Sequence, residues 1–192
     1  MTNLDDVTIS KAQYAVSRRG FLIGASTFGA GLSIGFLPGL ASGASEKAAM
    51  DEVNAWVQIA TDDTVTVRIV RSEMGQGTLT GLAQLVAEEL QCDWDKVTWE
   101  FPTPGESLAR ERVWGSFSTG GSRGLRSSQQ YVREGGAAAR MMLVQAAANK
   151  WGVPAVECRG DNSVITHGKS GRTTTYGNVA MAASELSIPE NI

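Results

Sequence analysis

The stretch from residue 73 to residue 90 constrains the fold of this chain more than any other. It begins with "EMGQG", and apolar residues then recur at the spacing of one helix face: Leu79, Leu82, Leu85, Val86 and Leu90. This spacing predicts a helix from Thr78 to Leu90, with glycines directly before its first turn. Glycines at that position expose backbone N–H groups where the helix dipole favours an anion.

The rest of the chain combines short strands and helices without a regular strand–helix–strand repeat. Two β-rich runs predict a hairpin within residues 55–70, and Pro102 ends a short strand at 96–101. The other predicted elements are a loop at 103–117, a long helix at 127–151, two strands within 162–176 and a helix at 176–186. Gly135-Gly136 within the long helix mark either close packing or a kink. We therefore expect an α+β fold, in which hairpins and short strands pack with two to three helices.

The first 45 residues differ in character from the remainder. The pair Arg18-Arg19, with Ser17 and Phe21, matches a twin-arginine export signal, and a glycine- and alanine-rich apolar stretch follows. The alternative is an arginine pair that caps an amphipathic or membrane helix. The twin-arginine route exports folded, cofactor-loaded proteins, so the signal predicts a cofactor protein of the periplasm. An uncleaved signal would tether it to the inner membrane. We expect residues 1–45 to be the signal and 46–192 the exported domain.

Charge and metal-ligand content exclude several classes of function. The net charge is −3 and the body of the chain has no long basic run, so nucleic acid has no electrostatic footprint here. Two cysteines and one histidine are too few for a structural zinc site or for an iron–sulfur cluster held by four thiolates. We expect the histidine, His167, to lie at the surface. The core and the helix ends should contain four tryptophans, Trp56, Trp94, Trp99 and Trp151.

A second glycine-rich stretch, "TGGSRG" at residues 119–124, precedes the predicted long helix. Taken alone, it resembles the turn that holds a nicotinamide dinucleotide in short-chain dehydrogenases. That function requires a hydrophobic strand upstream, an acidic residue about 20 positions later and a Tyr-x-x-x-Lys pair. Residues 108–117 are charged and irregular, residues 137–151 are helical, and no lysine follows Tyr131 at that spacing. The sequence therefore argues against a nicotinamide cofactor.

The two glycine-rich stretches together favour a ligand that bears phosphate. In the second stretch, backbone N–H groups, the Ser122 hydroxyl and the Arg123 guanidinium can hold a phosphate. In the first, the Gln76 amide offers both a donor and an acceptor, which suits a neutral polar group such as a pterin. Two such cradles, each at a helix start, fit an extended ligand better than either fits alone. The alternative is that they are helix-entry loops without a ligand.

The run "EMGQGTLTGLAQLVAEELQCDWDKV" resembles a segment of the molybdenum hydroxylases of the xanthine oxidase family. The order of the arginine pair, "MGQG", "GGSR" and "WGVP" is similar to the large subunit of its periplasmic branch, which includes isoquinoline 1-oxidoreductases and membrane-associated aldehyde dehydrogenases. The resemblance covers essentially the whole chain. One departure is Gly124, where the family pattern leads us to expect a serine. The resemblance implies that molybdopterin, as its cytosine dinucleotide form, contacts Met74, Gly75, Gln76, Gly77, Gly120, Gly121, Ser122 and Arg123.

The same resemblance implies a partial subunit. Large subunits of this family are several times longer, and neither their second cofactor-binding region nor their glutamate base is found here. We therefore expect a truncated or split subunit in which no catalytic residue can be named. The intact enzyme would oxidise aldehydes or N-heteroaromatic C–H groups with water as oxygen source. Its expected partners are a [2Fe–2S] small subunit, a cytochrome c acceptor and the rest of the large subunit as a separate chain. The alternative is a non-catalytic exported scaffold that binds a partner subunit.

Overall fold

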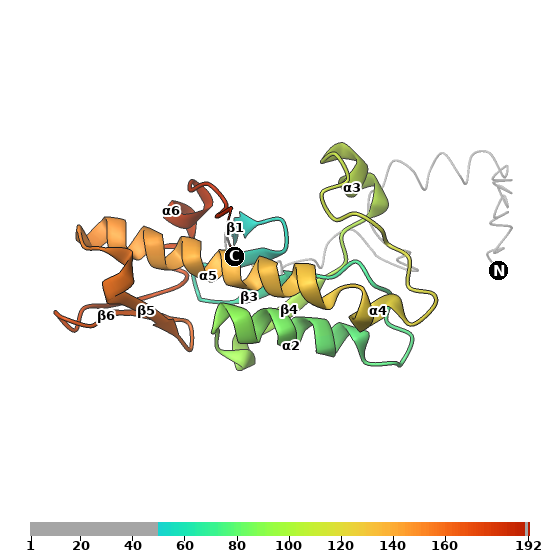
Figure 1. The fold of residues 1–192 in the computed structure, drawn as a ribbon, viewed down its shortest axis with the longest axis horizontal. Coiled ribbons are helices and arrows are strands. Elements are labelled where there is room, and N and C mark those ends of the chain that lie inside the picture. The colour runs from blue at the N-terminus through green and yellow to red at the C-terminus, as the bar shows by residue number, and fades with distance from the viewer. Residues whose placement is uncertain (1–49, 191) are drawn as a thin grey trace, which may run out of the picture. The chain divides into compact units, whose positions relative to one another are not determined.

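The computed structural model describes residues 50–190 and residue 192, and its first sheet contains four strands (Figure 1). Their order in the sheet follows the chain: β1 (Met50–Asn54), β2 (Val57–Ala60), β3 (Val65–Arg68) and β4 (Val97–Glu100). The pairs β1–β2 and β2–β3 are antiparallel, whereas β3 and β4 run parallel. The predicted hairpin and the predicted strand at 96–101 are confirmed. The sequence pattern does not indicate β1.

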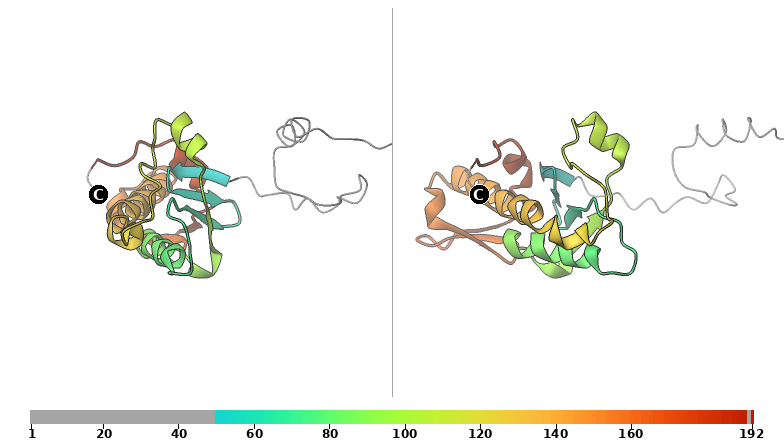
Figure 2. Two further views of the ribbon diagram at one scale, coloured as in Figure 1. Left: turned by 90° about the vertical axis from the view of Figure 1, so that its right-hand side faces the viewer. Right: turned by 45° about the vertical axis from the view of Figure 1, so that its right-hand side comes forward.

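Consecutive parallel strands need a long crossover, and helix α2 (Thr78–Leu90) lies in the connection between β3 and β4. Its bounds are those predicted from the apolar spacing. Helix α5 (Gln129–Trp151) lies alongside α2 (Figures 1 and 2). A Cβ atom on Gly136 would lie 2.6 Å from the carbonyl oxygen of Val86 in α2. Gly136 therefore marks close packing of the two helices, whereas Gly135 lies against Trp56. Helix α5 continues through the glycine pair as one helix.

A second sheet, antiparallel and three-stranded, follows α5. Its strands lie in the order β5 (Cys158–Asp161), β6 (Val164–His167) and β7 (Thr173–Thr175). The two strands predicted within 162–176 are confirmed, and β5 is additional. The last helix, α6 (Ala180–Ser184), is shorter than predicted. Tyr176 lies before it as a buried residue, and its hydroxyl donates to the carbonyl oxygen of Leu90 at 2.8 Å, which joins the end of α2 to this region.

The segment at 103–117, predicted as a loop, contains a short helix, α3 (Pro104–Ala109). A capping box begins this helix, because Thr103 and Glu106 each accept a hydrogen bond from the other's backbone N–H. Proline at its first position also favours a helix. The later residue Trp114 is buried and lies 5.4 Å from the guanidinium of Arg68 on β3, so the segment covers part of the sheet. Three shorter turns complete the chain, α4 (Arg123–Arg126) and the 3₁₀ turns Trp94–Lys96 and Ala155–Glu157.

The α+β class is confirmed, but two tryptophans and the histidine differ from expectation. Trp94 and Trp99 are 44% and 46% exposed. Trp94 lies in the 3₁₀ turn Trp94–Lys96, and Trp99 lies on β4, an edge strand of the sheet. His167 is 4% exposed, so a surface position is wrong. Its ring nitrogens lie 2.7 Å from the Ser170 hydroxyl and 3.0 Å from the Glu157 carboxylate, and these partners offset the cost of burying it.

Two further observations concern only the part of the chain that the structure describes. No helix in that part is long and apolar enough to cross a membrane. No group of three or more His, Cys, Asp or Glu side chains there could hold a metal ion. The predicted export signal, residues 1–45, lies outside the described residues, as does the start of the predicted domain at 46–192.

Candidate functional site

The first glycine loop (residues 72–77) leads the chain into α2. Gly75 and Gly77 have φ angles of 90° and 76°, in the left-handed region that favours glycine. Gly77 is also the N-cap of α2, and it has no side chain that could bond the N–H groups of the first helical turn. Those N–H groups therefore need an acceptor from elsewhere.

The acceptor is the carboxylate of Glu73. It accepts hydrogen bonds from the N–H groups of Gly75 at 2.7 Å, Gly77 at 3.0 Å and Leu79 at 2.9 Å. These bonds, with that from Leu79 the strongest influence, lower the pKa of Glu73 from its ordinary value of 4.5. The expectation that the N–H groups at this helix start are open is therefore wrong, because the chain supplies its own anion.

Gln76 is also held within the first glycine loop. Its Oε1 accepts from the N–H of Met74 at 2.6 Å. Its Nε2 donates to the carbonyl oxygen of Ser72 at 2.8 Å and to Oγ1 of Thr78 at 2.9 Å. The side chain of Met74, in contrast, is 72% exposed. The loop thus presents an adaptable apolar side chain to solvent. Both N–H donors of the Gln76 amide are used, so Gln76 can donate to a ligand only by exchanging these bonds.

The second glycine loop (residues 118–124) has open N–H groups. Gly121 and Ser122 have φ angles of 67° and 56°, and turns of this kind can direct successive N–H groups towards an anion. Within residues 50–190, the N–H groups of Gly121, Ser122 and Arg123 donate to no acceptor. The exposed guanidinium of Arg123 has no ion pair in the same range. This loop therefore offers the donors that a phosphate requires.

Hydrogen bonds hold the two glycine loops together beside the start of α2 (Figure 1). The N–H of Ser72 donates to Oγ1 of Thr119 at 2.9 Å. Arg71 is 5% exposed, and its guanidinium donates to Oγ of Ser128 at 2.8 Å and to the carbonyl oxygen of Ser118. Arg71 is a positioning residue that motif analysis does not identify. The available signal is a charged residue directly after the apolar pair Ile69-Val70 that follows β3.

Gly124 lies at a close contact between the second glycine loop and α2. It is buried, and a Cβ atom there would lie 3.0 Å from Cγ2 of Thr78 and closer still to its Oγ1. The same Oγ1 accepts the hydrogen bond from Gln76. A serine at residue 124, as expected from the family pattern, would therefore require the Thr78 side chain to move. Gly124 avoids this contact.

The two loops together have the chemistry of an anion site with an apolar edge. The second loop fits a phosphate such as that of molybdopterin, and the first offers Met74 directly and Gln76 after exchange of its bonds. No catalytic residue is identified in either loop. The residues expected to contact the cofactor all lie in these two adjoining loops, and their contact with it stays a prediction: Met74, Gly75, Gln76, Gly77, Gly120, Gly121, Ser122 and Arg123.

Known proteins resemble almost the whole of this chain. The family model "molybdopterin cofactor-binding domain" matches residues 5–191. Isoquinoline 1-oxidoreductase subunit beta of Brevundimonas diminuta is 34% identical over 180 residues, covering 92% of this chain and 23% of that protein. The membrane-bound aldehyde dehydrogenase (pyrroloquinoline-quinone) of Gluconacetobacter polyoxogenes is 32% identical over 178 residues, covering 88% and 22%. The chain thus spans less than a quarter of the length of these curated relatives.

Two solved structures are more distant. Quinoline 2-oxidoreductase from Pseudomonas putida 86 is 17% identical with a TM-score of 0.43, and the Cu,Mo-CO dehydrogenase is 22% identical with a TM-score of 0.49. Each match covers 66% of this chain and 15% of the other. The family model is decisive, and it confirms the resemblance found in the motifs. This chain belongs to the family of molybdopterin cofactor-binding domains.

Proposed function

We propose that the two glycine loops form part of the molybdopterin site of a molybdenum hydroxylase. The observation that carries this proposal is the meeting of the loops beside the start of α2. Arg71 ties them by binding Ser118 and Ser128, and Ser72 binds Thr119. Two short glycine-rich segments, 45 or so residues apart in the chain, thereby form one continuous surface that can contact one extended ligand.

Each loop has a different part in the proposal. The open N–H groups and the Arg123 guanidinium of the second loop hold the cofactor phosphate. Met74 packs against the pterin, and Gln76 exchanges its bonds within the first loop for bonds to the pterin. Gly75, Gly77 and Gly120 allow the backbone to approach closely. The cytosine dinucleotide form of the cofactor is proposed, because its further phosphate gives Arg123 a second acceptor.

We propose that the complete enzyme oxidises aldehydes or N-heteroaromatic C–H groups with water as oxygen source. When bound, the molybdenum cofactor supplies the centre that takes up the two electrons. The names of the two curated relatives support these substrate classes. One of those names mentions pyrroloquinoline quinone, but the family model that matches residues 5–191 describes a molybdopterin cofactor-binding domain.

We propose the partners that the resemblance to the molybdenum hydroxylases implies. The catalytic glutamate and the second cofactor-binding region are supplied by the remainder of a large subunit, as a separate chain. Electrons leave through a [2Fe–2S] small subunit to a cytochrome c. Because the chain spans less than a quarter of its curated relatives, we assign it only a share of the cofactor contacts and no catalytic residue.

We propose that residues 1–45 direct export to the periplasm, and that an uncleaved signal tethers the protein to the inner membrane. The support is the arginine pair at 18–19 and the apolar stretch after it. Replacing Arg18 and Arg19 with lysine should retain the protein in the cytoplasm, as measured by cell fractionation. A periplasmic double variant would contradict the proposal.

The cofactor proposal is tested with Gln76→Ala in the full chain, purified with its co-expressed partner subunits. Loss of one hydrogen bond of about 1.4 kcal/mol to the pterin should lower cofactor affinity about tenfold. The measurement is molybdenum and pterin content per protein, by mass spectrometry and pterin fluorescence. Gln145→Ala is the matched control, since Gln145 is an exposed glutamine of α5 that bonds only Asn149. The proposal would be overturned if the wild-type complex contained no molybdenum.

A second candidate is an exported scaffold that binds a partner subunit and no cofactor. The observation that favours it is the first glycine loop, in which Glu73 and Gln76 already satisfy the groups that a ligand would use. In that case Gln76→Ala changes neither the molybdenum content nor the activity of the complex. The same experiment therefore separates the two candidates.

A further inference from the structure

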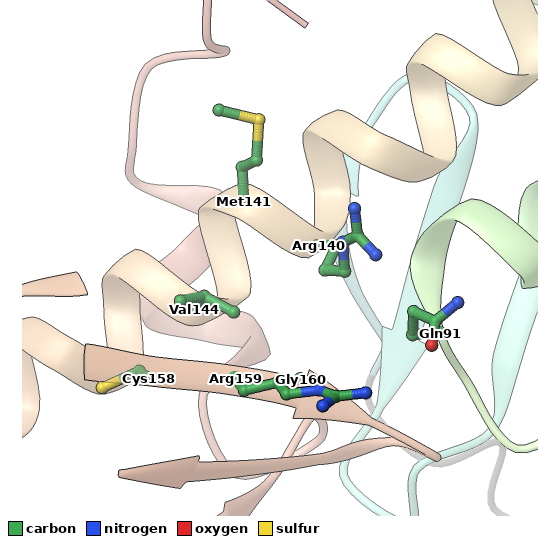
Figure 3. Close-up of a pocket in the computed structure, with 7 residues that line it drawn as sticks. All are labelled: Gln91, Arg140, Met141, Val144, Cys158, Arg159 and Gly160. Atoms are coloured by element: carbon green, nitrogen blue, oxygen red, sulfur yellow. The ribbon is translucent and has the colours of Figure 1, made fainter. Parts of the chain in front are cut away.

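An open cavity of about 420 Å³ lies near the C-terminal end of α2. It is lined by Gln91, Arg140, Met141, Val144, Cys158, Arg159 and Gly160 (Figure 3). The lining residues come from three places: the residue that follows α2, the middle of α5 and strand β5. Since α2 has 13 residues, the cavity lies about 20 Å along the helix from the first glycine loop. It shares no residue with either loop.

Two arginines enter this cavity without an acceptor. Arg140 extends from α5 and Arg159 from β5, and Figure 3 shows both guanidinium groups towards the side where Gln91 lies. Within the described part of the chain, neither guanidinium forms an ion pair or a hydrogen bond. In contrast, Arg68 bonds the carboxylates of Glu52 and Glu100, and Arg71 bonds oxygen atoms of Ser118 and Ser128. The cavity therefore concentrates positive charge that its own residues do not neutralise.

Neighbouring acidic side chains do not supply the missing acceptor. Asp161 follows Gly160 in β5, and Glu88 lies one turn before Gln91, yet neither forms an ion pair in the described residues. The side-chain amide of Gln91 donates to the carbonyl oxygen of Glu88 at 2.7 Å, which leaves its own oxygen as an acceptor. Arg140 and Arg159 thus remain the charged donors of the cavity.

The rest of the cavity wall is apolar. Met141 and Val144 lie on α5, and Cys158 lies opposite them on β5. Burial and the nearby Glu157 carboxylate raise the pKa of the Cys158 thiol, so it stays protonated and uncharged at neutral pH. Gly160 has no side chain, and the hydroxyl behind it, that of Tyr176, is already used by Leu90. The cavity thus has positively charged guanidinium groups at one side and an apolar wall at the other. This combination favours an anion that also has an apolar part.

We propose that this cavity binds a small phosphate monoester whose organic group is apolar. Two guanidinium groups match the two negative charges of a phosphate monoester and can each form paired N–H···O bonds to it. A volume of about 420 Å³ lies within the range of small-molecule sites, so the apolar group fits against Met141 and Val144. The site does not depend on the proposed cofactor function, because none of its residues belongs to the glycine loops.

The test is isothermal titration calorimetry of the full chain with phenyl phosphate, inorganic phosphate and benzoate. We expect saturable binding of phenyl phosphate, and at least about tenfold weaker binding of the other two, one of which lacks the apolar group and the other the second charge. Arg140→Gln and Arg159→Gln should each weaken phenyl phosphate binding about tenfold. Circular dichroism and thermal melting establish that each variant is folded.

Two further variants locate the binding. Arg112→Gln removes the same charge from an exposed arginine outside the cavity, and it should leave the affinity unchanged. Arg123→Gln tests the second glycine loop. Loss of phenyl phosphate binding with Arg123→Gln, but not with Arg140→Gln or Arg159→Gln, would overturn the cavity site while supporting the cofactor proposal. The inference also fails if no phenyl phosphate binds, if Arg112→Gln weakens it equally, or if benzoate binds as tightly.

Discussion

The two glycine loops both precede a helix and both contain left-handed residues, but they use their N–H groups differently. In the first loop, the Glu73 carboxylate accepts three N–H groups, so the helix start is neutralised by the chain itself. In the second, the N–H groups of Gly121 and Ser122 have no acceptor in the described residues, and Arg123 adds a positive charge. Glycine and a helix start are therefore not enough to make an anion site.

The difference follows from the charged residue beside each glycine loop. An acidic side chain just before the glycines can turn back onto the N–H groups, as an N-terminal anion of the helix. In the second loop the residue before the glycines is Thr119, and the charged residue is Arg123, which follows them. A basic side chain attracts an anion and cannot itself accept from the N–H groups. The first loop is thus a rigid support with an exposed Met74, and the second is the part that is free to bind a phosphate. Three substitutions test this distinction.

The largest effect is expected from Arg71→Met, because Arg71 joins the loops. The change leaves the buried Oγ of Ser128 without its donor and removes the bond to Ser118. Hydrogen bonds to charged groups are worth about 1.5–3 kcal/mol, so we expect the free energy of unfolding to fall by about 3 kcal/mol. Urea unfolding measures it. Adding Ser128→Ala to Arg71→Met should lower the free energy of unfolding only a little further. If Arg71→Met alone lowers it by less than about 1 kcal/mol, other contacts hold the loops together.

A smaller effect is expected from Gly124→Ala, which places a Cβ atom against Thr78. Overpacking of this kind costs about 1–3 kcal/mol, so unfolding should become easier by about 2 kcal/mol. Thr78→Ala in the same chain should restore part of the loss, in a double-mutant cycle. The control is Gly120→Ala, since no atom lies within 4 Å of a Cβ atom there. Equal losses for the two glycine variants would argue against a specific contact with Thr78.

The smallest effect is expected from Glu73→Gln, and it should depend on pH. The N–H groups that bond Glu73 lower its pKa from 4.5 in the native state. Its contribution is therefore fully present above that ordinary value and is lost as the pH falls through the native pKa. Glu73→Gln should be less stable than wild type at pH 7, and the difference should shrink in acid. Urea unfolding at both pH values measures this.

The control for that experiment is Glu185→Gln, an exposed glutamate with no ion pair in the described residues. Its stability difference from wild type should not follow the same pH course. A Glu73→Gln difference that persists unchanged at acid pH would mean that the carboxylate charge has no part in holding the first loop.

Prediction from the sequence is correct where a local pattern dictates the structure. The apolar side chains from Leu79 to Leu90 lie on one face only if the segment is a helix. The glycines before this helix end any preceding strand. Prediction fails at β1 and β5, because "MDEVN" and "CRGD" have no apolar alternation and become strands only by pairing with β2 and β6. His167 is buried for a similar reason, since Glu157 and Ser170 reach it only in the folded hairpin.

By itself, the sequence determined the α+β class, the bounds of α2, the two glycine-rich segments and their resemblance to molybdopterin-binding proteins. Each of these depends on residues that are close together in the sequence. Only the tertiary structure decided how those segments are used. The close packing of α5 against α2 at Gly136, and the buried Arg71, place the second loop beside the first. The same fold directs Glu73 onto the start of α2 and places Gly124 against the side chain of Thr78. These are contacts between groups whose geometry exists only once the chain has folded.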